Sequence, residues 1–142
     1  MKLHTRFFPV LGLFLVLLGT GEALGDDPTP EAAQGSFVTA EVAYHAGLAA
    51  EEAGDHVLAR AKFQEALQVH PGFSSAQRKL DEVQVVLIQK ARTVYAQAST
   101  MERANQHERA AILFQEVMRM VEDPGNDLYQ RAQAKRVSLS RE

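Results

Sequence analysis

The 142-residue chain contains no cysteine and no tryptophan. Without cysteine it cannot form disulfides, zinc–thiolate sites, iron–sulfur clusters or covalent c-type haem links, and it offers no thiol nucleophile. Basic residues are also fewer than acidic ones, with 15 Lys+Arg against 18 Asp+Glu and a net charge of -3 at pH 7. Because a nucleic-acid-binding surface needs a basic patch or stripe, this balance argues against a nucleic-acid partner.

The chain has a long apolar run at residues 7–18, close to its N-terminus and preceded by Lys2 and Arg6. Small residues follow at positions 23 and 25, a pattern typical of the cleavage site of a secretory signal peptide, with residues 19–21 as a second possible cleavage site. A run of 12 residues is shorter than the roughly 20 needed to cross a bilayer, which disfavours the alternative of a retained membrane anchor. We therefore expect residues 1–25 to be a signal peptide, and we expect no membrane contact after its removal.

The next segment, residues 26–35 (DDPTPEAAQG), contains two prolines, three acidic residues and no bulky apolar side chain. Such a composition buries too little apolar surface to offset the entropy of ordering, so the segment is predicted to be a flexible linker. An exported chain without cysteine suits the bacterial periplasm or cell envelope, with secretion as the other destination.

Glycine and proline are scarce after residue 36, and no stretch alternates apolar and polar residues as a strand would. The few breaks fall at Gly54, at residues 71–72 and at residues 124–125. They predict helices at residues 37–53, 56–70, 74–104, 107–121 and 127–138, with Ser36 capping the first helix and Ser74 or Ser75 the third.

The third predicted helix is 30 residues or so long and has no internal breaker, although a break near residues 89–90 is the alternative. Its apolar residues recur in steps of three and four, which keeps one face of a helix apolar over about 45 Å. This stripe consists of Ala76, Leu80, Val83, Leu87, Ala91, Val94, Ala98 and Met101.

The chain repeats itself when it is shifted by 51 residues. The identities in this alignment are Ala40/Ala91, Tyr44/Tyr95, Glu51/Glu102, Ala53/Ala104, His56/His107, Ala59/Ala110, Phe63/Phe114, Gln64/Gln115 and Glu65/Glu116. Internal repeats of helical segments indicate a repeated structural unit.

The first copy, at residues 43–71, resembles a tetratricopeptide repeat (TPR), a helical hairpin with small and aromatic residues at fixed positions. The matching residues are Gly47 at the helix crossing, Gly54-Asp55 in the turn, Ala59, Phe63 and Ala66 on the second helix, and Pro71 after it. The resemblance departs at Ala50, where the family usually has an aromatic residue, and it weakens in the second copy, where Val117 replaces a small residue.

The fold expected from these patterns is all-α. Two TPR-like hairpins, with repeat copies at about residues 40–73 and 91–126, form one domain over residues 36–142. The copies are 51 residues apart, whereas such repeats usually recur about every 34 residues. The additional residues 74–90 are predicted to cover the first hairpin and to continue into the second, and the last helix is predicted to cap the second hairpin.

The resemblance implies a protein-binding surface on the first helix of each hairpin, with a merely solvated face as the alternative. In the first copy this surface should comprise Glu41, Tyr44, Leu48, Glu51 and Glu52, and in the second Arg92, Tyr95, Ser99, Glu102 and Arg103. Exposed aromatic residues and arginines are typical of protein interfaces.

Residues 85–88 are four consecutive apolar residues, which cannot all lie on one face of a helix. Leu87 belongs to the core stripe, so Val85 and Ile88 are predicted either to lie under the last helix or to contact another copy of the chain in a homodimer.

The sequence contains no glycine-rich phosphate loop and no nucleophile elbow. We therefore expect a non-enzymatic interaction module without a cofactor, acting as a scaffold, adaptor or assembly factor that binds another protein or peptide in the cell envelope. The alternatives are a self-associating structural subunit and, less favoured, a metal carrier or enzyme that uses His45 and His56.

Overall fold

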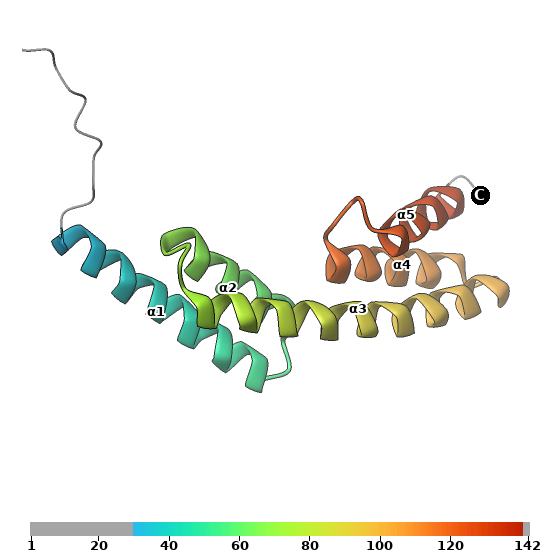
Figure 1. Ribbon diagram of the computed structural model, residues 1–142. Helices are drawn as coiled ribbons and strands as arrows, with labels where there is room; N and C mark the ends of the chain where they lie inside the picture. The colour runs from blue at the N-terminus through green and yellow to red at the C-terminus, as the bar shows by residue number, and fades with distance from the viewer. Residues whose placement is uncertain (1–29, 141–142) are drawn as a thin grey trace, which may run out of the picture.

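The computed structural model describes residues 30–140, and this part of the chain consists of α-helices and short connections without strands (Figure 1). None of these helices is both long enough and apolar enough to cross a bilayer. The predicted signal peptide and the first four residues of the predicted linker lie outside the described residues. The helices are α1 (Pro30–Glu52), α2 (His56–Val69), α3 (Ser74–Arg103), α4 (His107–Val121) and α5 (Asp127–Leu139).

The start of α1 differs from the prediction. The helix begins at Pro30, so the second half of the predicted linker is helical and Ser36 lies inside the helix instead of capping it. Proline favours the first position of a helix, and residues 31–34 (EAAQ) are acidic or strongly helix-forming, which together override the composition argument.

The prediction for the third helix is confirmed in length but not in its cap. Helix α3 is continuous over 30 residues, without a break at residues 89–90. Its N-cap residue is Phe73, which provides no side-chain hydrogen bond, and Ser74 is already helical. The two serines therefore do not cap the helix.

The five helices form two three-helix units that share α3 (Figure 1). In the first unit, α1 and α2 pack as a hairpin and the first half of α3 covers them. In the second unit, the second half of α3 forms a hairpin with α4, and α5 covers it. The predicted all-α fold with two hairpins and a long shared helix is confirmed.

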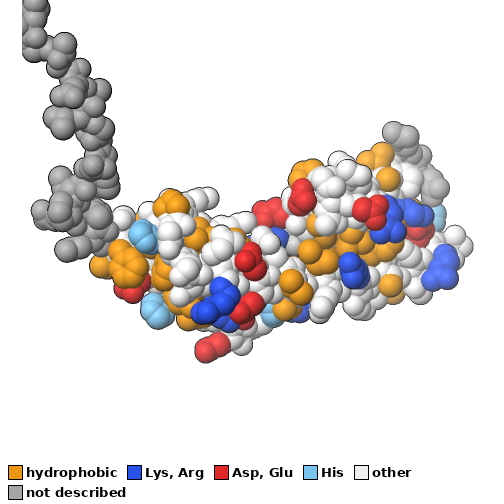
Figure 2. Space-filling model, viewed as in Figure 1, with side chains coloured by type: hydrophobic (Ala, Val, Ile, Leu, Met, Phe, Trp, Pro, Cys, Tyr) orange, Lys and Arg blue, Asp and Glu red, His pale blue; other side chains and the backbone are white. Residues whose placement is uncertain are grey.

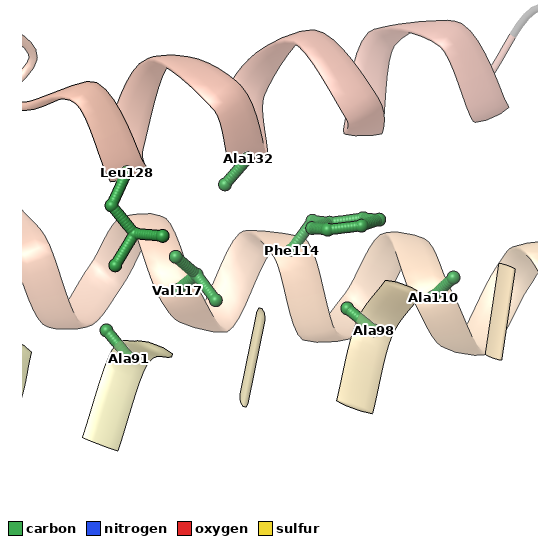
Figure 3. Packing of buried hydrophobic residues seen from close by; sticks show 7 residues of the cluster. All are labelled: Ala91, Ala98, Ala110, Phe114, Val117, Leu128 and Ala132. Carbon is green, nitrogen blue, oxygen red and sulfur yellow. The ribbon is translucent and has the colours of Figure 1, made fainter. Parts of the chain in front are cut away.

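The second unit shows how the core is built (Figure 3). Phe114 and Val117 of α4 are fully buried and lie between α3 below and α5 above. Small residues face them, with Ala98 on α3 and Ala132 on α5. Large side chains from the middle helix therefore fill the space that the alanines of its neighbours leave open.

The shift of 51 residues found in the sequence relates the contacts of the two units. Phe63 and Phe114 are both fully buried. The ring of Tyr44 lies 5.7 Å from that of Phe63, and the ring of Tyr95 lies 5.3 Å from that of Phe114. The turns correspond as well, because Gly54 and its equivalent Asn105 both have positive φ values, 79° and 57°.

Gly47 is a close helix crossing, as the sequence predicted. A Cβ atom at this position would lie 2.5 Å from Cε1 of Phe63, well inside van der Waals contact. Glycine is needed here because the backbone of α1 rests directly on the aromatic ring. In the second unit Ala98 takes this place, with the ring of Phe114 close by (Figure 3).

The crossing predicts opposite effects for two glycine-to-alanine substitutions in the same helix. Gly47→Ala forces Phe63 to move and should lower the free energy of unfolding by about 1–3 kcal/mol. Gly35→Ala is the matched control, because a Cβ there meets nothing within 4 Å and should raise stability by about 0.5–1 kcal/mol through better helix propensity. Urea unfolding followed by circular dichroism measures both, and equal changes in the two variants would contradict this packing.

Candidate functional site

The predicted binding residues of α1 lie largely on the side of the helix that turns toward α3. Tyr44 contacts the ring of Phe73 at 5.1 Å between centroids in addition to that of Phe63, and Leu48 packs against the core. Glu51 accepts a hydrogen bond of 3.2 Å from Nζ of Lys79 on α3. These side chains hold the first unit together, and each of them keeps part of its surface exposed.

The same arrangement recurs in the second unit, where α5 takes the place of the first half of α3. Tyr95 lies under the guanidinium of Arg131, 5.7 Å from the ring centre, and Glu102 accepts a hydrogen bond of 2.9 Å from Lys135. The hydroxyl of Ser99 donates to the carbonyl oxygen of Tyr95 within the helix. In each unit, therefore, a Lys–Glu pair joins the first helix to the helix that covers it.

These two lysines are held in their charged form. The pKa of Lys79 is raised, first by hydrogen bonding to Glu82 and then by hydrogen bonding to Glu51, and that of Lys135 is raised by hydrogen bonding to Glu102. A raised pKa means that the stabilising contribution is complete below the ordinary lysine pKa of 10.5 and is lost only as the pH rises beyond it. Both pairs are therefore intact throughout the neutral range.

The remaining predicted residues are accessible to different extents. Glu41 is half-buried, whereas Glu52, Arg92 and Arg103 are exposed. Arg92 and Tyr95 come together in a cleft of about 490 Å³ between α3 and the start of α5, which is also lined by Ile88, Asn126, Asp127, Leu128 and Arg131.

The two units meet at Arg60, a buried charged residue of α2 that is 5% exposed. Its guanidinium donates hydrogen bonds of 2.6 and 3.1 Å to the carbonyl oxygens of Met120 and Arg119, in the last turn of α4. It also forms an ion pair of 2.9 Å with Glu122. The last carbonyl groups of a helix lack partners within it and carry partial negative charge, so Arg60 caps α4.

A cleft of about 420 Å³ adjoins this contact between the two units. Its lining mixes polar, acidic and apolar side chains from α2, α3 and the end of α4, namely Arg60, Gln64, Gln84, Ile88, Met120, Val121, Glu122, Asp123 and Asn126. Ile88 thus faces the junction, while Val85 is 57% exposed. Over the second unit, hydrophobic side chains gather between α3 and α5 (Figure 2).

In residues 35–140, no three His, Asp or Glu side chains come together in a way that could hold a metal ion. Nδ1 of His56 lies 2.7 Å from the carbonyl oxygen of Gly54 and 3.0 Å from Nζ of Lys90. His45 is exposed beside the ring of Tyr44.

Arg60 is not among the residues predicted from the sequence, because an arginine on a helix is ordinarily assigned to the surface. A signal was present in the internal repeat, where the residue equivalent to Arg60 is Ala111. The charge is therefore not part of the repeat pattern, and it lies where the two units contact each other, beside Met120, which packs against the core of the first unit.

Removing the Arg60 side chain should weaken the contact between the units. Arg60→Ala leaves two carbonyl groups of α4 without their donor and should lower the free energy of unfolding by about 2–4 kcal/mol. Arg60→Met keeps most of the aliphatic volume and should recover only part of this loss.

The matched control for Arg60→Ala is Lys62→Ala, because the Lys62 ion pair with Glu65 lies within one helix and should contribute less than about 0.5 kcal/mol. Chemical denaturation measures the stability of each variant. Hydrogen exchange should become faster at the C-terminal turn of α4 in the Arg60 variants alone, and unchanged exchange there would refute the capping role.

Comparison with known proteins does not assign the chain to a family. No family model, no curated protein and no solved structure matches it. Its function has to be inferred from the helices, contacts and surfaces of the molecule itself.

Proposed function

We propose that the protein is a non-enzymatic protein–protein interaction module, a TPR-like scaffold or adaptor exported to the bacterial cell envelope. The observation that carries this proposal is the duplicated unit, in which a hairpin with a close Gly47 or Ala98 crossing is covered by one further helix. Stacked helical hairpins provide extended surfaces rather than enclosed sites, and helical repeat proteins use such surfaces to bind other proteins.

The clefts of the molecule are consistent with this role. They lie between helices near the surface and are lined by mixtures of Gln, Asn, Arg and acidic side chains with a few apolar residues. The cell-envelope location rests on the apolar run and the small residues of the predicted signal peptide.

A second candidate, the self-associating structural subunit, is supported by Val85. This side chain is 57% exposed on α3 and is available for contact with another copy. Ile88 supports the candidate less, because it lines the clefts of its own chain.

Affinity capture distinguishes the two candidates. The bait is the full chain with a C-terminal tag, expressed in the cells that produce it and recovered from envelope extract. We expect a different protein to be captured in stoichiometric amount, because the proposed surface recognises a partner. Recovery of nothing would contradict the adaptor role. Recovery of the chain itself alone would also contradict it and would favour self-association through Val85.

A control bait tests the predicted binding face. It carries Arg92→Glu and Arg103→Glu, which reverse exposed charges of that face and leave its packed residues intact. Loss of the partner from this bait would place the binding surface there, and equal capture by both baits would rule that surface out. Circular dichroism confirms that the control bait is folded.

A further inference from the structure

Helix α1 has an exposed apolar surface opposite its packed side. We call Val38, Val42, Ala46 and Ala49 the outer face of α1, and the exposed polar side chain of His45 lies within the same stripe. Val38 and Val42 are 59% and 67% exposed, and the two alanines are exposed as well. Steps of four, four and three residues place them in one stripe of about three helical turns, roughly 17 Å long. Hydrophobic side chains gather at the N-terminal end of this helix (Figure 2).

The second unit shows that the fold does not require this apolar surface. Shifted by 51 residues, the four positions of the outer face become Gln89, Thr93, Gln97 and Thr100, all of which are polar and exposed, whereas His45 within the stripe becomes the exposed Ala96. The buried positions on the opposite side are small and apolar in both units, as in Gly47 and Ala98. Because an exposed apolar stripe lowers solubility without helping this fold, a binding role accounts for it.

The charged residues around the outer face indicate which kind of partner would fit there. Helix α1 contains Glu31, Glu41, Glu51 and Glu52 and no lysine or arginine. Glu51 is paired with Lys79, whereas Glu52 is exposed and Glu41 is half-buried beside the stripe. The stripe is therefore bordered by negative charge, which favours an occupant with basic residues flanking its apolar side.

A second copy of the chain fits this surface poorly. Two α1 helices facing each other would bring Glu41 and Glu52 of both copies together, which is unfavourable. Helix α5 carries the exposed bases Arg131 and Arg136, but among its described residues it offers only Ala134 and Val137, the latter 37% exposed, as exposed apolar side chains. A second copy would therefore bring little apolar surface to the outer face.

We propose that the outer face of α1 docks an amphipathic helix of another protein, with a small-residue or leucine stripe flanked by lysine or arginine. The alanines at positions 46 and 49 permit close approach of a second helix, at the short end of the usual 8–10 Å between axes. The two valines supply the apolar contact, and Glu41 and Glu52 pair with the flanking bases. This inference rests on the adaptor role proposed above and names the surface and the chemistry of the partner.

The second unit provides the test variant. Val38→Gln, Val42→Thr, Ala46→Gln and Ala49→Thr together give the outer face the residues that α3 already carries at the equivalent exposed positions, so the variant is expected to fold. The matched control is Ile112→Thr with Val137→Gln, which removes exposed apolar side chains elsewhere. Thermal melts followed by circular dichroism check that both variants are folded.

The probe is a labelled synthetic helix of about five turns, with a leucine and alanine stripe flanked by lysine, and its twin has glutamate in place of each lysine. Fluorescence anisotropy should show binding of the lysine peptide to the native chain and to the control variant. Binding should be about tenfold weaker or worse for the outer-face variant and for the glutamate twin. Absence of binding, equal binding of the two peptides, or equal binding to the outer-face variant would overturn the proposal.

The capture experiment separates this inference from the adaptor role. If the native bait retains a partner and the outer-face variant loses it, both proposals stand, provided the partner is a different protein. If both baits retain it equally, the outer face is not the docking site although the adaptor role survives. Self-association of the native chain in analytical ultracentrifugation that the outer-face variant abolishes would also overturn the proposal.

Discussion

The continuity of α3 is the constraint on which the rest of the structure depends. One apolar stripe runs along this helix from Ala76 to Ala98. Its first half covers the hairpin of α1 and α2, and its second half is itself the first helix of the next hairpin. A break in α3 would leave two small units, each with too little buried apolar surface to be stable alone. The shared helix therefore makes one domain out of two copies.

Arg60 adds a second connection between the units, and it works differently from the repeated contacts. The crossing of an aromatic ring with a small residue recurs in both copies, whereas the arginine occurs once and reaches from α2 to the last turn of α4. Buried charges are costly unless they are fully paired. Here two carbonyl groups and Glu122 satisfy the guanidinium, so the contact fixes the spacing between the units and shapes the cleft beside it.

The internal packing also determines which surfaces remain for a partner. Tyr44, Glu51, Tyr95 and Glu102 make contacts within the units, because side chains at or next to the covering helix reach the first helix of each hairpin. The outer face of α1 remains apolar and accessible, whereas the equivalent positions of α3 are polar. The difference between two otherwise matched copies is thus the observation on which the proposed docking surface rests.

Local patterns in the sequence specify the helices, the length of α3 and the correspondence of the two copies. These patterns are the breakers at the turns, the apolar steps of three and four, and the identities 51 residues apart. It also predicted the close crossing at Gly47 from a small residue opposite Phe63. Which polar side chains form contacts within the molecule depends on the tertiary structure. Glu51 reaches Lys79 across 28 residues and Arg60 reaches Met120 across 60, and such pairs depend on how the helices are placed in space, which local periodicity does not encode.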